Sequence, residues 1–196
     1  MAVSTTRQAE PLGARLLRGA AGGLLSGTVF AAVAMWYADS TGGNAGVPLQ
    51  MISTLVRGSE ALLRGTGSAG MGLAIHAALS VLYGALFGLA VPRFRTNGTV
   101  AIAGTLYGGL LFVVNFVYLA PLAFYAFAKA NYPFELFAHL VYGMLLSFAF
   151  FGSGVRRGEP VVALQPRPPR QVRHQPLPDR AVRAPDGQRR PSPPTP

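Results

Sequence analysis

Four long stretches without a charged residue constrain the fold of this chain more than any other feature of its sequence. They are separated by shorter segments that carry Arg, Lys, Asp or Glu. Each stretch has about the 20 residues that a helix needs to cross a hydrocarbon core of about 30 Å. Only a helix satisfies its own backbone polar groups there. The sequence therefore predicts membrane-spanning helices at residues 19–38, 70–91, 100–122 and 136–154.

The composition agrees with a membrane protein. Charged residues make up 12% of the 196-residue chain, about half of the roughly 25% that is usual in soluble domains. Apolar residues make up 51%, so too little polar sequence remains to cover a large soluble core. We predict an all-α integral membrane four-helix bundle at residues 16–154, a cytoplasmic N-terminal segment at 1–15 and a disordered cytoplasmic tail at 155–196.

Basic residues gather at one end of the predicted helices. Arginines precede the first helix, occupy the turn between the second and third, and follow the fourth: Arg7, Arg15, Arg18, Arg93, Arg95, Arg156 and Arg157. At the other end the basic residues are offset by acids: Arg57, Arg64, Lys129, Asp39, Glu60 and Glu135. Because cytoplasmic loops are rich in Lys and Arg, we expect a multi-pass cell-membrane protein with both termini in the cytoplasm.

A cleavable signal peptide is an alternative interpretation of the first stretch. Arg15 and Arg18 would form its basic region, and Ala32-Val33-Ala34 its cleavage site. However, the apolar run continues to Ala38. Cleavage would leave three spans in the same orientation.

The predicted outer loop, residues 39–64, is long enough to hold structure of its own. Pro48 is suited to the first turn of a short helix. Leu49, Ile52, Val56, Leu62 and Leu63 then fall roughly on one side. The loop is therefore either a helix along the outer membrane interface or an irregular connection.

From Val155 the composition changes abruptly. Eleven of the sixteen prolines lie beyond this point, and no aromatic residue does, which is typical of a disordered segment. Its arginines are suited to anionic lipid head groups, and its prolines to a polyproline-binding domain. A solvated tail without a partner is the alternative. Nucleic acid is not expected as a partner, because the basic residues flank apolar segments or fill the tail.

Small residues recur at four-residue intervals in the predicted spans, and residues four apart share a helix face. They are Gly19, Gly23, Gly27, Ser80, Gly84, Gly88, Gly104, Gly108, Gly143 and Ser147. Such stripes let helix backbones approach closely in lipid. Three spans also share a short string, Leu82-Tyr83-Gly84, Leu106-Tyr107-Gly108 and Val141-Tyr142-Gly143. The pattern predicts close packing within one chain or against a second copy.

Two histidines in the spans form the core of the one candidate site. His76 precedes Arg93 by seventeen residues, and His139 precedes Arg156 by the same number. Both therefore lie at one depth in the outer part of the bilayer, on the faces that carry the small residues. Glu135 lies one turn before His139, and Asn115 is near the outer end of the third span. We expect His76, His139, Glu135 and Asn115 to line an outward-facing polar pocket, because ionisable groups within a membrane are costly.

Three uses of this pocket stay open at the sequence level. The two imidazoles could ligate a haem iron or a divalent metal, a His–Glu couple could relay protons in a transporter, or each His could hydrogen-bond a neighbouring helix. The chain has no cysteine, which excludes disulfides and thiolate ligands. No cofactor and no catalytic residue are predicted, and Gly65–Gly72 lacks the Lys of a phosphate loop.

The string His139-Leu140-Val141-Tyr142-Gly143, together with His76 in a Gly-rich four-span chain, resembles the small YagU-like inner-membrane proteins of bacteria. The resemblance covers residues 16–153 and does not include the Arg/Pro-rich tail. It implies a multi-pass plasma-membrane protein without an established biochemical activity. The preferred interpretation is a structural or interaction bundle, with small-residue faces that are suited to self-association. The alternatives are a transporter or channel subunit and a haem- or quinone-linked redox subunit.

Overall fold

The computed structural model describes residues 10–152, which belong to the first of the two units into which the chain divides. Across these residues the elements are all helical, and no β-strand occurs among them. The predictions made for residues 1–9 and for the tail, including its disorder and its lipid or protein partners, lie outside the described residues.

Three helical segments are long and apolar enough to cross a membrane. They are α1 (Leu12–Ser40); α4 (Ala69–Ala90) with the 3₁₀ turn η1 (Val91–Arg93); and α5 (Asn97–Phe112), continued by the π-helix η2 (Val113–Leu119) and by α6 (Ala120–Ala123). The fourth long helix, α7 (Tyr132–Phe148), has 17 residues. At 1.5 Å per residue it is about 26 Å long, slightly less than the hydrocarbon thickness.

The predicted boundaries of the first and fourth spans differ from those of the helices. The first helix begins at Leu12 rather than near residue 19, and the fourth ends at Phe148 rather than at residue 154. Charge-free runs do not mark helix ends, because Arg is a good helix former and the helix passes through it. Arg18 lies inside α1 and pairs with Glu10 at 2.9 Å. Beyond α7, Gly152 adopts a positive φ of 68°, which a helix does not contain.

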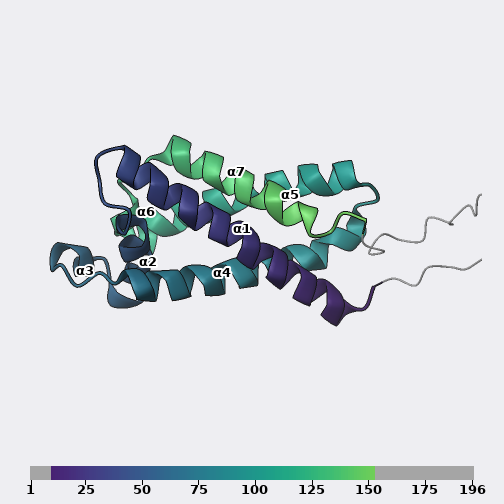
Figure 1. The fold of residues 1–196 in the computed structure, drawn as a ribbon, viewed down its shortest axis with the longest axis horizontal. Coiled ribbons are helices and arrows are strands. Elements are labelled where there is room, and N and C mark those ends of the chain that lie inside the picture. The colour runs from purple at the N-terminus through teal and green to yellow at the C-terminus, as the bar shows by residue number, and fades with distance from the viewer. Residues whose placement is uncertain (1–9, 153–196) are drawn as a thin grey trace, which may run out of the picture. The chain divides into compact units, whose positions relative to one another are not determined.

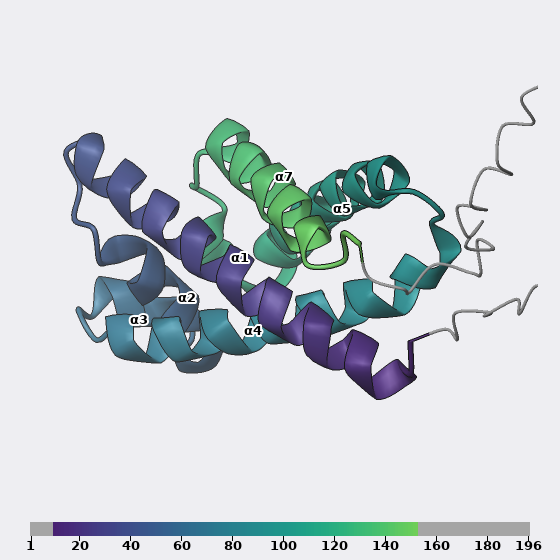
Figure 2. The same ribbon diagram turned by 45° about the vertical axis from the view of Figure 1, so that its right-hand side comes forward.

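The long helices pack mainly as two pairs, α1 with α4 and α5 with α7, and α1 also contacts α7 (Figures 1 and 2). Small residues form the closest contacts in both pairs. A Cβ added at Gly23 would collide with the backbone of Ser80, and one added at Gly104 with that of Gly143. All eight glycines among the ten small residues named from the sequence make close contacts between α1 and α4 or between α5 and α7, and Ser80 and Ser147 are contact partners of these glycines.

Two short helices, α2 (Val47–Arg57) and α3 (Glu60–Leu63), follow α1, and Pro48 lies in the first turn of α2. The alternative of an irregular connection is therefore wrong for residues 47–57. α2 packs on α4, where a Cβ added at Gly72 would collide with the carbonyl of Leu49. Not all of its predicted apolar side is covered, since Val56 is 71% exposed.

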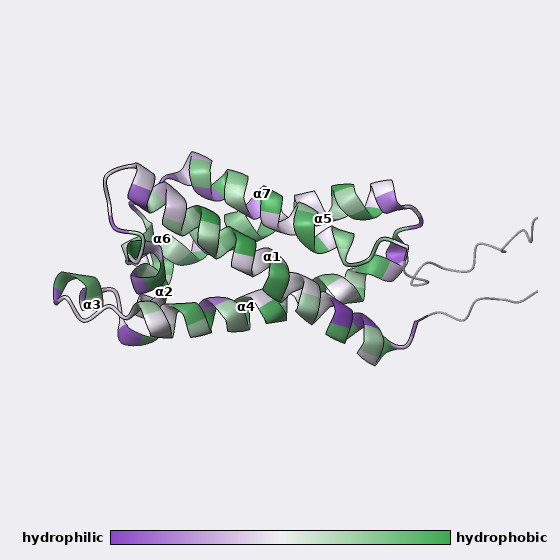
Figure 3. Cartoon of the chain, viewed as in Figure 1, coloured by the Kyte–Doolittle hydropathy of each residue, from purple (hydrophilic) through white to green (hydrophobic). Residues whose placement is uncertain are grey.

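The two ends of this helical unit differ in how completely buried side chains fill the space between the helices. α1 begins and α7 ends at the end that carries the turn after η1, whereas α2, α3 and α6 gather at the opposite end (Figure 1). Hydrophilic residues are concentrated towards both ends, and the middle is hydrophobic (Figure 3). The main buried cluster fills the basic end and the middle: Phe87, Val91, Val100, Leu111, Tyr142, Leu146 and Phe150. The α2 end is less completely filled, and it contains the candidate site.

Candidate functional site

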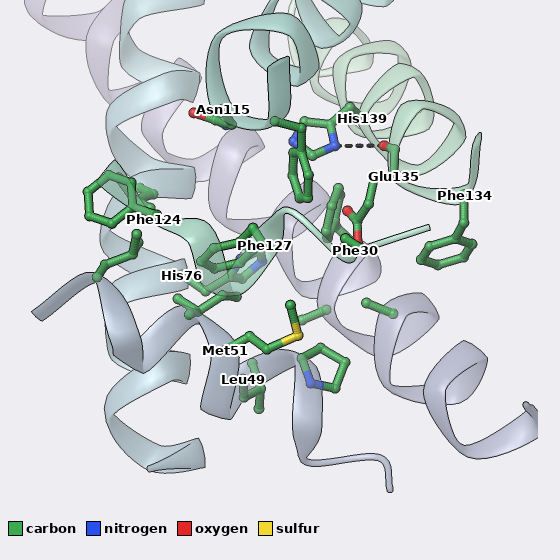
Figure 4. A pocket seen from close by; sticks show the side chains of 18 of the residues that line it. Phe30, Leu49, Met51, His76, Asn115, Phe124, Phe127, Phe134, Glu135 and His139 are labelled. Carbon is green, nitrogen blue, oxygen red and sulfur yellow. Dashed lines mark hydrogen bonds between the residues drawn. The ribbon is translucent and has the colours of Figure 1, made fainter. Parts of the chain in front are cut away.

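A cavity of about 540 Å³ lies at the α2 end of the bundle. Its walls come from the second half of α1, from α2, from the middle of α4, from the π-helix, from the segment 124–131 and from the first half of α7. All four residues of the predicted pocket line it: His76, Asn115, Glu135 and His139. Figure 4 shows His139 and Glu135 on one side and Leu49 and Met51 of α2 on the opposite side.

The lining is mainly apolar and aromatic, whereas the sequence suggested a polar pocket. Five phenylalanines from four different elements contribute to it: Phe30, Phe116, Phe124, Phe127 and Phe134. α2 adds aliphatic side chains, including Leu49 and Ile52. The prediction differs from the observed lining because it considered only the polar groups at one membrane depth. The rest of the lining is apolar and comes from the helical faces between these groups and from the segment after α6.

His139 is held in one orientation by its own helix. Its Nδ1 lies 2.7 Å from the carbonyl oxygen of Glu135, one turn earlier. A carbonyl only accepts, so Nδ1 carries the proton and donates it, and Nε2 of the neutral ring is left as an acceptor. The ring packs edge-on against Phe30 and Phe116, with centroid distances of 4.9 and 5.4 Å. His139 is 7% exposed.

His76 makes the equivalent bond to a neighbouring helix. Its Nε2 lies 2.8 Å from the carbonyl oxygen of Gly27 in α1 and donates to it, so Nδ1 is the acceptor of the neutral ring. The ring of Phe30 contacts this imidazole as well, with a centroid distance of 5.6 Å. The two imidazoles therefore share one aromatic neighbour. Each keeps one ring nitrogen without a hydrogen bond to the described residues.

Asn115 belongs to a set of tyrosine hydrogen bonds that sequence reasoning did not identify. Tyr83 of α4 donates to Asn115 Oδ1 at 3.1 Å, and Tyr107 of α5 donates to the carbonyl of Tyr83 at 2.9 Å. Tyr142 of α7 donates to the carbonyl of Ser80 at 3.0 Å. The repeated Tyr-Gly string was the available signal: in each span the tyrosine hydroxyl reaches another helical segment, next to a glycine at a close helix contact.

A proline lies just beyond the π-helix at the cavity wall. In π-helical pairing the carbonyl of residue i accepts from residue i+5, so Phe116 would pair with residue 121. That residue is proline and has no N–H. Tyr132 donates to the Phe116 carbonyl instead, at 2.9 Å. This arrangement accompanies the wider turn from which Asn115 and Phe116 line the cavity.

Glu135 is the one acidic side chain in the cavity lining, and Lys129 is the one basic side chain. The Glu135 carboxyl makes no hydrogen bond or ion pair within residues 10–152, and Lys129 is exposed. Glu135 lies in the first turn of α7, just before the predicted span that starts at residue 136.

Few side chains that could ligate a metal lie together in the cavity. Within the described part of the chain, no three His, Asp or Glu side chains gather as they would around a metal ion. Axial haem ligation by His76 through Nε2 would require its bond to Gly27 to break. The two histidines and Glu135 therefore offer unpaired acceptors in an aromatic cavity.

Comparisons of the chain with protein-family models, with curated proteins and with solved structures found no match.

Proposed function

We propose that this chain is a four-span plasma-membrane protein, with both termini cytoplasmic, that binds a small and mostly apolar molecule in the cavity at its α2 end. In this proposal α7 is the fourth span, and the chain is a member of the YagU-like family that its sequence resembles. The three long apolar helices support a membrane location. The basic residues Arg15, Arg18, Arg93 and Arg95 lie at the end opposite to the cavity, which favours an outward-facing site.

The observation that carries the proposal is the cavity itself. Ligand sites in proteins typically enclose about 300–1,000 Å³ and combine an apolar lining with a few placed polar groups. This cavity has about 540 Å³ and many aromatic walls, and its polar lining includes the four predicted side chains, which come from three helical segments. A purely structural bundle accounts for the small-residue contacts but gives no reason for such a space.

Binding is favoured over conduction because the basic end is closed by packing. Phe87, Leu146 and Phe150 are at most 2% exposed and lie between the cavity and that end. A transport path would have to separate these side chains. The transporter interpretation therefore requires a second conformation, whereas ligand binding does not.

Cysteine labelling tests the orientation. The chain has no cysteine, so each single-cysteine variant has one reactive site. In intact cells we expect an impermeant maleimide to label Thr41→Cys, in the exposed turn after α1, and not Asn97→Cys, at the exposed start of α5. Both variants should react after permeabilisation. Labelling of Asn97→Cys in intact cells would invert the proposed topology.

Filling the cavity tests ligand binding. Ala34 is 7% exposed and lines the cavity from α1, so Ala34→Phe should occupy part of the space. In zwitterionic nanodiscs, we expect it to weaken calorimetric binding of phenylbutanol at least about tenfold, a loss near 1.4 kcal/mol. The control is Ala78→Phe, at an exposed position of α4 that does not line the cavity. Ile52→Trp on α2 provides a second block if Ala34→Phe is unstable. Equal binding by all four proteins would refute a cavity site.

A further inference from the structure

Three acceptors in the cavity lining are left without a hydrogen bond within residues 10–152. The carboxyl of Glu135, Nε2 of His139 and Nδ1 of His76 are acceptors without a partner among the described residues. The tyrosine hydroxyls near them donate elsewhere: Tyr142 bonds the Ser80 carbonyl and Tyr83 bonds Asn115. A ligand that brings its own N–H or O–H groups would meet the unused acceptors.

The aromatic side chains add a second preference. Phe30, Phe116, Phe127 and Phe134 all line the same space as Glu135, and Figure 4 shows Phe30 beside its carboxyl. The face of an aromatic ring carries negative potential and attracts ammonium groups. A partly buried carboxylate without a counter-ion has the same preference. Both features select a cation, and the one basic side chain of the lining, Lys129, is exposed.

We propose that the occupant of the cavity is a protonated organic amine with an apolar body, whose ammonium group contacts the Glu135 carboxylate and whose N–H groups reach the histidine acceptors. This inference rests on the ligand-binding function proposed above and specifies the chemical class of its ligand. The apolar body lies against the phenylalanines and against Leu49 and Met51 of α2.

Three probes with the same phenylbutyl body and different head groups test the inference: phenylbutylammonium, phenylbutanol and phenylbutyrate. Each is titrated against the full-length protein in zwitterionic nanodiscs, and binding to empty nanodiscs is subtracted. We expect the ammonium to bind about tenfold or more tightly than the alcohol, because hydrogen bonds to charged groups are the stronger class. The butyrate should bind most weakly.

Glu135→Gln should bring the affinities for ammonium and alcohol to within about threefold of each other while alcohol binding persists, which also shows that the variant is folded. The matched control is Glu60→Gln, which removes the same charge at an exposed position of α3 outside the cavity lining. It should keep the full preference for the ammonium. An unchanged preference in Glu135→Gln would overturn the assigned contact.

The other outcomes separate this inference from the proposed function. If the alcohol and the ammonium bind equally, and Ala34→Phe blocks both, the cavity binds ligands without selecting a cation and this inference fails alone. If no probe responds to Ala34→Phe, both proposals fail.

The pH dependence provides a second readout. The groups that face Glu135 across the cavity are His76 on α4, His139 on α7, Lys129 in the 124–131 segment and Tyr37 on α1. Only the ionised form of the Glu135 carboxyl attracts an ammonium. Affinity for phenylbutylammonium should therefore rise with increasing pH as this carboxyl ionises, while affinity for phenylbutanol stays level. Glu135→Gln should remove most of that rise, and a pH profile unchanged in this variant would contradict the assignment.

Discussion

Gly84→Ala is expected to destabilise the protein by about 1–3 kcal/mol, the usual cost of adding a methylene to a close-packed site. A Cβ at residue 84 would collide with the carbonyl oxygen of Gly19 and would lie 2.7 Å from the Cα of Gly23. Both are backbone atoms of α1, so no side-chain rotation relieves the contact. The two helices must separate, and the whole α1–α4 interface loses dispersion contacts as they do. Unfolding in a series of detergent mixtures with increasing dodecyl sulfate measures the change in free energy.

Gly70→Ala is the matched control, since it makes the same chemical change in the same helix. Nothing lies within 4 Å of a Cβ added at Gly70, and Ala has a helix propensity up to about 1 kcal/mol better than Gly. This variant should be as stable as the native protein or slightly more stable. Gly143→Ala probes the second pair, because its added Cβ would collide with the carbonyl of Gly104. If Gly84→Ala and Gly70→Ala unfold alike, the close contact is not what joins α1 to α4.

The helix faces that pack closely were predictable, because the four-residue spacing and the small size of the side chains together identify such a face. The intervals between Gly19, Gly23 and Gly27 place three small residues on one side of a helix, and in lipid a side of that kind packs against a neighbour. What the pattern leaves open is the choice of partner. Any two of the four stripes satisfy the same rule, and the pairing of α1 with α4 depends on loop geometry and on side-chain fit along the whole interface.

The candidate site was predictable in its polar residues and not in its shape. The equal distances from His76 to Arg93 and from His139 to Arg156 indicated a common depth, and both side chains line one cavity. The cavity itself depends on features that no local pattern contains. Pro121 accompanies the widened turn at Phe116, and the segment 124–131 places Phe124 and Phe127 across from α2. The sequence gives no direct indication of the volume that such a combination leaves empty.

α2 forms one wall of the cavity, and its close packing on α4 depends on one glycine. A Cβ added at Gly72 would collide with the carbonyl oxygen of Leu49 and would lie 3.0 Å from its Cα. Leu49 is 6% exposed, and Met51 and Ile52 line the cavity from the same helix. Gly72→Ala should therefore displace α2 while the pairs α1–α4 and α5–α7 stay assembled, because the atoms that an added Cβ would meet all belong to Leu49.

The expected result is about a tenfold loss of affinity for phenylbutanol, since a displacement that costs about 1.4 kcal/mol of α2 docking changes binding by that factor. The same change should speed amide hydrogen exchange across Val47–Arg57 and leave exchange in the middle of α5 and α7 unaltered. Gly70→Ala, two residues earlier in α4 and open on its Cβ side, should do neither. Faster exchange in α2 without weaker binding would show that this helix covers the cavity without taking part in recognition, and the ligand contacts would then lie with α1, α4 and α7 alone.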